Sequence, residues 1–159
     1  MIRVGLGYDI HPLGEGAPLI LGGVRITYIK GLLGYSDADV LTHAVIDALL
    51  GAAALGSLGQ LFPEIDPQYK NASSLRMLKE TVDLVHEAEF RVVNVDANVI
   101  AEEPRLNPYI ENMCATLAEP LCVRPDCVSV KARTNERFGP EGSEDAISAQ
   151  AVVLIESAG

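Results

Sequence analysis

Residues 39–55 constrain the fold most strongly, because their apolar side chains recur at the spacing of one helix face. The apolar positions are Val40, Leu41, Ala44, Val45, Ala48 and Leu49. Just before them, Ser36 and Asp37 are candidate N-caps, and Ser36 with Asp39 has the spacing of a capping box. The sequence therefore predicts a core-facing helix over 39–55.

The rest of the chain alternates between strand and helix patterns. Strands are expected at 2–10, 92–101, 128–134 and 146–155, with a hairpin of 19–21 and 24–26 around Gly22-Gly23. Helices are expected at 73–87 and 108–118, and loops at 56–71 and 138–145. This order predicts one domain over residues 1–159, of the α/β or the α+β class, with a small mixed sheet.

Composition limits the functions that the chain can have. Of its 159 residues, 48% are hydrophobic and none is Trp, so the core must be built mainly from Val, Ile, Leu and Ala. A net charge of -10 with only 12 basic residues argues against nucleic-acid binding, which needs clustered Lys and Arg. Cys114, Cys122 and Cys127 show no CxxC spacing, so we expect reduced thiols rather than disulfides or a zinc knuckle.

The ends and apolar runs of the chain bear on its location. No apolar run is long enough to cross a bilayer, so no membrane partner is expected. Residues 1–5 have the pattern of a strand rather than of a signal or transit peptide. We expect a cytoplasmic location in a bacterium, or the plastid stroma if a transit peptide has been removed.

Two histidines and an aspartate have the pattern of a metal site. Asp9 and His11 are two residues apart in the first strand, so their side chains point the same way. With His43 they supply one carboxylate and two imidazoles, the ligand set of a catalytic zinc with an open position. Asp39 and Asp47 lie four residues on either side of His43 and are candidates to orient its second nitrogen. A lone helix histidine is more often a core residue, so the pattern alone leaves both interpretations open.

A series of short motifs extends along nearly the whole chain. They are Gly7-Tyr8-Asp9-Ile10-His11, Leu21-Gly22-Gly23-Val24, Tyr35-Ser36-Asp37-Ala38-Asp39-Val40 leading to His43-Ala44, Asp47-Ala48-Leu49-Leu50-Gly51-Ala52-Ala53, Leu61-Phe62-Pro63, Asn94-Val95-Asp96 and Val130-Lys131-Ala132. In this order they resemble the 2-C-methyl-D-erythritol 2,4-cyclodiphosphate synthase family. The resemblance implies an α+β fold, an α/β two-layer sandwich with a small mixed four-stranded sheet and helices on one face. It also implies a homotrimer of such ferredoxin-like or chorismate-mutase-like subunits, with active sites between neighbouring subunits.

The family's reaction explains why such residues are needed. The resemblance implies a phosphorus-oxygen lyase that cyclises 4-CDP-2-C-methyl-D-erythritol 2-phosphate to 2-C-methyl-D-erythritol 2,4-cyclodiphosphate and releases CMP, in non-mevalonate isoprenoid precursor biosynthesis. The 2-phosphate attacks the β-phosphorus, and a phosphate dianion needs no strong protein base. The barrier is charge repulsion and alignment, which divalent metals and positioning groups lower.

The resemblance also implies roles for individual residues. Asp9, His11 and His43 would hold Zn²⁺, Glu136 would hold Mg²⁺ or Mn²⁺, and Tyr35 and Thr134 take catalytic positions. Substrate contacts around the polyol are implied for Asp9, His11, Tyr35, Ser36, Ser57, Leu58, Gly59, Phe62, Glu64 and Asp66. Contacts to the nucleotide and phosphates are implied for Ala101, Glu102, Glu103, Pro104, Arg105, Leu106, Ala132, Arg133, Thr134, Asn135, Glu136, Pro140 and Ser143.

Five positions depart from the family pattern. Tyr35 replaces a histidine beside the reacting phosphate, and Ser57 replaces an aspartate that contacts the polyol. Pro140 replaces an aromatic residue, Ser143 replaces a phosphate-binding arginine, and Arg133 stands at the first threonine of a Thr-Thr-Glu pattern. Our hypothesis is that Arg133 supplies the phosphate charge lost at Ser143.

These departures keep two alternatives open. Besides a cyclodiphosphate synthase, they are a drifted relative that acts on a related nucleotide diphosphate and a non-catalytic trimer. The trimer would keep Zn²⁺ as a structural ion and bind an isoprenoid or nucleotide as a regulator. Incubation with the CDP-linked substrate discriminates among these three hypotheses, because only the synthase releases CMP and forms the cyclic diphosphate from it.

Overall fold

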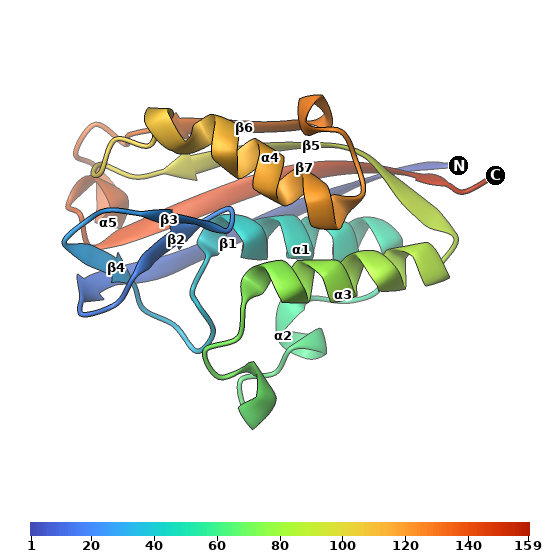
Figure 1. Ribbon diagram of the computed structural model, residues 1–159, viewed down its shortest axis with the longest axis horizontal. Helices are drawn as coiled ribbons and strands as arrows, with labels where there is room; N and C mark the ends of the chain where they lie inside the picture. Colours follow the sequence, from blue (N-terminus) through green and yellow to red (C-terminus); the bar gives the residue numbers. More distant parts are fainter.

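The computed structural model describes all 159 residues and has a main five-stranded sheet, with helices packed on one of its faces, and a separate two-stranded hairpin (Figure 1). The strands are β1 (Ile2–Glu15), β2 (Leu19–Leu21), β3 (Val24–Ile26), β4 (Lys30–Leu32), β5 (Phe90–Ile100), β6 (Val128–Arg133) and β7 (Ala146–Ser157). The helices are α1 (Val40–Ala53), α2 (Leu58–Leu61), α3 (Ser74–Glu87), α4 (Ile110–Leu121) and α5 (Gly139–Gly142), with 3-10 turns at Pro67–Tyr69, Asn107–Tyr109 and Pro125–Cys127. The α+β class and the one-sided layer of helices are as expected.

The main sheet is mixed and has the strand order β4-β1-β7-β5-β6. Only β5 and β6 are parallel, and all other neighbours are antiparallel. The four expected strands are present, and β4 adds a fifth, three-residue strand at one edge. The expected first strand, 2–10, is too short: β1 continues to Glu15 because it pairs first with β7 and then with β4.

The cap of α1 differs from the expectation. The helix is capped by Asp39, whose carboxylate accepts hydrogen bonds from Thr42 N at 3.0 Å and Thr42 Oγ1 at 2.7 Å. The same carboxylate accepts from the backbone of the β2–β3 turn, Gly22 N at 2.9 Å and Gly23 N at 2.7 Å. The candidate caps Ser36 and Asp37 are therefore wrong, because Asp39 fills this role and also fastens the hairpin to the helix.

Helix α1 lies directly on β1, and two glycines permit this close approach. A Cβ atom at Gly5 would lie 1.8 Å from Ala48 O, and one at Gly7 would lie 1.8 Å from Ala44 O. No side chain fits in either place. The approach brings the first turns of α1 next to the part of β1 that carries Asp9 and His11.

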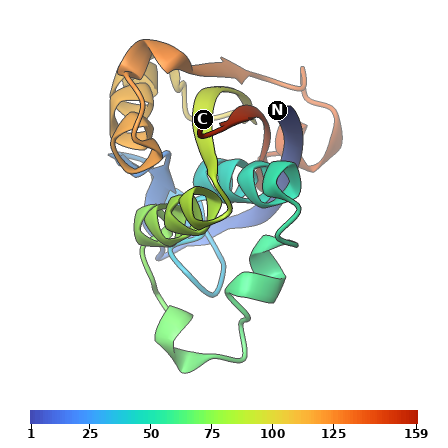
Figure 2. The ribbon, with the colours of Figure 1, turned by 90° about the vertical axis from the view of Figure 1, so that its right-hand side faces the viewer.

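The remaining helices cover the rest of the same sheet face. Leu78, Val82 and Val85 of α3 are fully buried as expected, and α4 packs against β6. The expected loops contain the short helices α2 and α5, whose four residues give too little periodicity to be recognised. The segment with α2 and the Pro67–Tyr69 turn extends away from the sheet (Figure 2). No helix combines the length and apolar character that a membrane crossing requires.

The opposite face of the sheet is not covered by the helices. Along β1 its side chains are apolar and exposed, by 67% at Ile2, 64% at Val4 and 71% at Leu6. Asp96 of β5 lies on this face, as its pairing with the exposed Val152 shows. Ser148 of β7 is buried, and its hydroxyl donates to Glu141 Oε1 of α5 at 2.5 Å.

Candidate metal centre and two pockets

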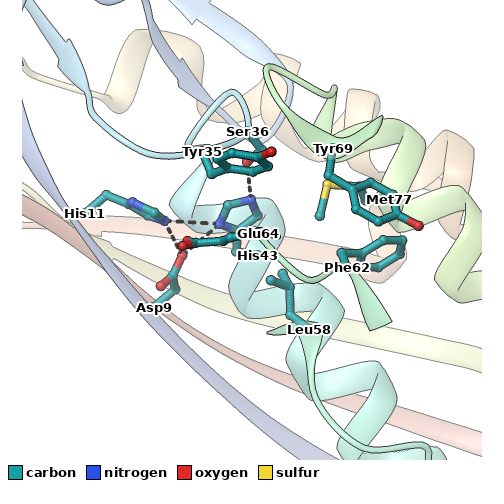
Figure 3. A pocket seen from close by; sticks show the side chains of 10 residues that line it. All are labelled: Asp9, His11, Tyr35, Ser36, His43, Leu58, Phe62, Glu64, Tyr69 and Met77. Atoms are coloured by element: carbon teal, nitrogen blue, oxygen red, sulfur yellow. Dashed lines mark hydrogen bonds and ion pairs between the residues drawn. The ribbon is translucent and has the colours of Figure 1, made fainter. Parts of the chain in front are cut away.

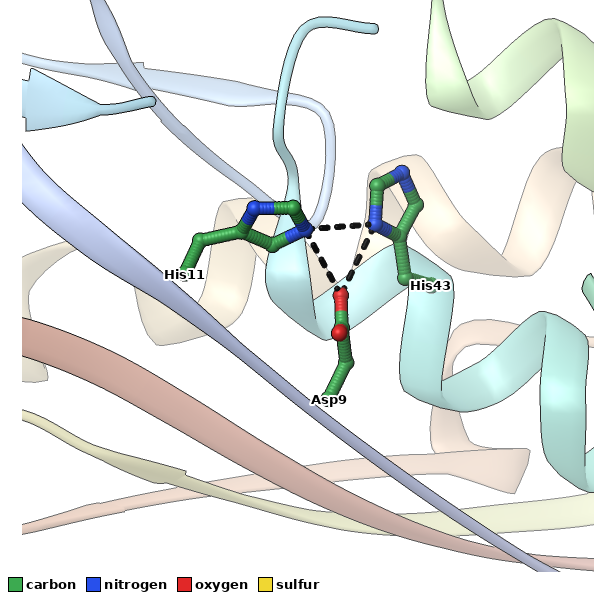
Figure 4. A group of neighbouring side chains, drawn as sticks. All are labelled: Asp9, His11 and His43. Atoms are coloured by element: carbon green, nitrogen blue, oxygen red, sulfur yellow. Dashed lines mark hydrogen bonds and ion pairs between the residues drawn. The ribbon is translucent and has the colours of Figure 1, made fainter. Parts of the chain in front are cut away.

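Asp9, His11 and His43 converge at one point (Figure 4). Asp9 and His11 project from β1 on the same side, and His43 projects from the first turn of α1. Asp9 Oδ2 lies 2.9 Å from His43 Nδ1 and 3.0 Å from His11 Nε2. The two imidazole nitrogens, His11 Nε2 and His43 Nδ1, are 3.3 Å apart. The sequence prediction that these three residues come together is confirmed.

The other ring nitrogens are held by oxygen atoms. His11 Nδ1 lies 3.0 Å from Leu33 O. Because a carbonyl only accepts, Nδ1 of the neutral ring carries the proton and Nε2 presents its lone pair to the centre. His43 Nε2 lies 3.1 Å from Ser36 Oγ and 2.9 Å from Ser74 Oγ.

Neither aspartate expected to orient His43 does so. Asp39 is fully buried and caps α1. Asp47 Oδ1 accepts from Leu58 N at 2.7 Å and so joins α1 to α2. Both carboxylates satisfy backbone N–H groups instead of the imidazole, which is the physical reason why the expectation is wrong. Ser74 was not recognised, because it is 31 residues from His43 and no local pattern marks it.

The pKa values of Asp9 and His11 are shifted by their neighbours in this centre. Burial raises the pKa of Asp9, but the hydrogen bonds with His11 and His43 and their positive charges outweigh it and hold the pKa at about 2. The hydrogen bond to Asp9 raises the pKa of His11 despite the opposing effect of burial, and the charge of Glu64 contributes to the rise. Without a metal, Asp9 therefore favours the protonated form of His11 over that of a free imidazole.

The geometry of the centre fits a divalent metal ion. A tetrahedral zinc with nitrogen and oxygen ligands about 2.0–2.1 Å away has ligand atoms about 3.3 Å apart. The three separations of 2.9, 3.0 and 3.3 Å are close to this value. A carboxylate that faces two imidazole nitrogens at this distance is stabilised by a cation between the three groups. These residues can therefore hold a divalent metal.

A pocket of about 150 Å³ opens beside the centre (Figure 3). It is lined by Asp9, His11, Tyr35, Ser36, His43, Leu58, Phe62, Glu64, Tyr69 and Met77. The Glu64 carboxylate is turned toward the three metal-binding side chains (Figure 3). The Tyr35 hydroxyl donates to Asp66 O at 3.3 Å. Tyr69 and Met77 were not recognised from the sequence, where they are simply part of a loop and of a helical apolar face.

Three other residues expected around the polyol do not line this pocket. The Ser57 hydroxyl and backbone N–H both donate to Gln60 Oε1, at 3.4 and 3.0 Å, and so stabilise the start of α2. Gly59 is exposed on α2. The Asp66 carboxylate accepts from Gln68 N at 3.1 Å and Gln68 Nε2 at 2.6 Å. Within one chain, the side chains of Ser57 and Asp66 therefore form hydrogen bonds only inside their own segments.

A second pocket, of about 290 Å³, lies where β5 and β6 end. It is lined by Ala101, Glu102, Pro104, Arg105, Leu106, Asn107, Ala132, Arg133 and Thr134. The chain thus brings together most residues expected around the nucleotide, adds Asn107 and leaves Glu103 outside the lining. Thr134 belongs to this pocket, whereas Tyr35 belongs to the first, and the two pockets share no residue.

The loop from Asn135 to Ser143 contributes to neither pocket of one chain. Asn135 Nδ2 donates to the buried Glu141 at 3.3 Å. Glu136 is exposed and has a left-handed backbone, with φ of 51°. The Ser143 hydroxyl lies 2.7 Å from Asp145 Oδ2, within its own loop, and Pro140 is exposed on α5.

The chain is similar to known proteins over nearly its whole length. The model of the YgbB family matches residues 2–156. The 2-C-methyl-D-erythritol 2,4-cyclodiphosphate synthase of Syntrophomonas wolfei is 55% identical over 157 residues, which are 99% of this chain and 100% of that protein.

Solved structures are similar to this chain in both fold and sequence. The bifunctional IspDF from Campylobacter jejuni has a TM-score of 0.95 and 38% identity over 99% of this chain, which spans 42% of that larger chain. The complex of IspF from Plasmodium falciparum with CDP has a TM-score of 0.87 and 32% identity, over 99% of this chain and 97% of that one.

Proposed function

The chain belongs to the YgbB family, and we propose that it cyclises 4-CDP-2-C-methyl-D-erythritol 2-phosphate to 2-C-methyl-D-erythritol 2,4-cyclodiphosphate with release of CMP. It would act as a metal-dependent phosphorus-oxygen lyase in isoprenoid precursor biosynthesis, with residues 1–159 forming one synthase domain. The observation that carries the proposal is the convergence of Asp9, His11 and His43 beside a pocket, in a chain 55% identical to a synthase over its whole length.

Asp9, His11 and His43 would hold Zn²⁺. The ion, when bound, supplies a Lewis acid for the diphosphate oxygens. Tyr35 lines the same pocket, and its hydroxyl can exchange Asp66 O for a phosphate oxygen as hydrogen-bond acceptor. A phenol donates a hydrogen bond without carrying a positive charge, so the positive charge near the attacking phosphate must come from elsewhere.

The second pocket would hold the CMP portion of the substrate. Residues 101–102, 104–107 and 132–134 line it, and their backbone groups would read the hydrogen-bonding edge of the base. Glu136 would hold Mg²⁺ or Mn²⁺, since such ions are commonly bound by one or two carboxylates together with substrate phosphates. Arg133 lines this pocket and forms no ion pair, so its charge is available to a phosphate.

The active form would be a homotrimer with active sites between subunits. Two observations support this part of the proposal. The pocket beside the metal centre and the nucleotide pocket share no residue within one chain. The apolar side chains of β1 on the uncovered sheet face are exposed, and a contiguous patch of this kind marks an interface.

The second candidate is a drifted family member with another nucleotide-diphosphate substrate or an isoprenoid ligand. It is motivated by Ser57 and Ser143, whose hydroxyls bond within their own segments. Phosphorus NMR of the zinc-loaded protein with the CDP-linked substrate separates the readings. Cyclic diphosphate with CMP is the expected result, whereas substrate binding without turnover contradicts the synthase proposal and favours a regulatory protein.

A further inference from the structure

A chain of buried polar contacts lies behind His43, on the side away from the metal centre. Ser74 is the first residue of α3 and is 0% exposed. Its hydroxyl oxygen lies 2.9 Å from His43 Nε2, and its hydroxyl also contacts Asp37 Oδ1. The Ser74 backbone N–H donates to Asp37 Oδ2 at 2.9 Å. These contacts connect α3, the segment before α1, and α1 itself.

The direction of each hydrogen bond follows from the chemistry of the groups. An ionised carboxylate only accepts, so the Ser74 hydroxyl donates its proton to Asp37. The lone pairs of the Ser74 oxygen then remain for His43, whose Nε2 must be the donor. A proton on Nε2 leaves Nδ1 of the neutral ring without one, and Nδ1 is the atom 2.9 Å from Asp9 Oδ2.

Ser36 also contacts His43 Nε2, at 3.1 Å, but it is placed differently. It lines the pocket and its oxygen accepts from Ala38 N at 3.3 Å. No carboxylate accepts its hydroxyl proton, so Ser36 does not impose a direction on the histidine. Ser74 is the hydroxyl that Asp37 orients.

We propose that Asp37 and Ser74 are positioning residues of the metal centre, which fix the orientation and tautomer of His43 so that Nδ1 faces the metal. The inference rests on the proposed metal-binding role of His43 and adds the two residues that enforce it. Groups that orient a metal-bound imidazole through its second nitrogen strengthen metal binding, and their loss costs about 10- to 100-fold in affinity.

The test measures zinc affinity by competition with a chelator in four variants of the full chain. Ser74→Ala is expected to weaken zinc binding by about 10- to 100-fold, and Asp37→Asn to weaken it less, because an amide oxygen can still accept from the serine. Ser73→Ala is the matched control: Ser73 is exposed and forms no capping hydrogen bond, so its affinity should equal that of the parent. Asp9→Asn, which removes a ligand, shows whether the zinc measured is at this centre.

Cobalt substitution gives a readout that a purely structural role of Ser74 would not change. The visible absorption of bound Co²⁺ reports the ligand geometry, and we expect it to differ from the parent in Ser74→Ala and to match the parent in Ser73→Ala. Parent-like zinc affinity and cobalt spectrum in Ser74→Ala would overturn the inference. If Ser74→Ala does not fold, parent-like zinc affinity in Asp37→Ala, which removes the acceptor of the serine proton altogether, overturns it instead.

Different results refute the metal centre and the positioning role of Ser74. If Asp9→Asn binds zinc as tightly as the parent, the metal centre itself is wrong and the inference falls with it. If Asp9→Asn loses zinc while Ser74→Ala retains full affinity, the centre stands and only the positioning role is refuted.

Discussion

At the scale of single residues, the proposed metal centre depends on an ionised aspartate, Asp9, and on a histidine, His11. A proton and the metal ion compete for the same lone pair of that histidine. The pKa of Asp9 is held at about 2, so this carboxylate is available at any physiological pH. The hydrogen bond to Asp9 raises the pKa of His11 above 6.5. Metal binding must therefore displace a proton from His11 whenever the pH is below that raised value.

This competition predicts a pH dependence of metal binding. In the metal-free protein the His11–Asp9 ion pair contributes stability below pH 6.5, and the contribution is lost as pH rises through the raised pKa of His11. Zinc affinity changes in the opposite sense and falls as pH drops through the same value. Chelator competition across this range checks the prediction, and a dissociation constant independent of pH would contradict it.

Arg133 gives the second prediction at this scale. If it supplies the charge that Ser143 lacks, Arg133→Ala removes a charge-assisted contact worth about 2–3 kcal/mol and lowers kcat/KM by about 30- to 150-fold. Arg137→Ala is the control, since Arg137 is exposed in the adjoining loop and lines neither pocket. Equal kinetics of the two variants would refute the role of Arg133.

Prediction from the sequence succeeded for residues whose chemistry is unusual and failed for those whose role is purely tertiary. Asp9 and His11 were recognisable because their spacing on a strand brings them to one side, and His43 because the family motifs surround it. Ser74 and Asp37 could not be found, because a serine 31 residues from a histidine carries no signal until α3 is packed against α1. Ser57 does not line the pocket of one chain, because its hydroxyl donates to Gln60, so its polyol contact stays a prediction.

At the scale of elements, the contact between α1 and β1 determines the site. The periodicity of 39–55 predicted the helix, and the actual bounds, Val40–Ala53, differ by only a few residues. The cap was wrong because three polar residues precede the helix and only the tertiary contact with the β2–β3 turn selects Asp39. Strand β4 and helices α2 and α5 were missed because three or four residues show no period.

Gly7→Ala tests the importance of this contact. The new methyl group would meet Ala44 O, one residue from His43, so α1 must move away from β1. We expect a loss of about 3 kcal/mol in the free energy of unfolding together with weaker zinc binding. Chemical denaturation of the zinc-free variant measures the first effect.

Gly51→Ala is the matched control for that variant. Gly51 is also in α1, but a Cβ atom there meets nothing within 4 Å. The substitution should stabilise the protein by about 0.5–1 kcal/mol, because alanine favours the helix. Equal destabilisation by the two alanines would mean that close packing of α1 on β1 does not matter.

At the scale of the whole molecule, the face of the main sheet that points away from α1 exposes apolar side chains. Ile2, Val4 and Leu6 are each more than 60% exposed on one strand face, and Tyr8 continues the row at 52%. The sequence pattern did not predict this row. In β1 the usual alternation of apolar inner and polar outer residues is missing, because glycines lie on the inner face and apolar residues on the outer one. The homotrimer that we propose would bury it.

Leu6→Asp should dissociate that assembly. A charge in the middle of the apolar row would have to be buried without a partner, which costs several kcal/mol per subunit. Light scattering should show the mass of a single chain for Leu6→Asp and of three for the parent. Asn112→Asp, an acidic substitution on the exposed side of α4, is the control and should leave the mass unchanged. A parent of monomeric mass would contradict the proposed trimer.

The most direct measurement for the account as a whole is anomalous diffraction at the zinc absorption edge from crystals grown with zinc. We expect one strong peak per chain, about 2 Å from Asp9 Oδ2, His11 Nε2 and His43 Nδ1, with a fourth position open to the pocket. A map with no peak between these three atoms, in a protein that still turns over its substrate, would contradict the central claim.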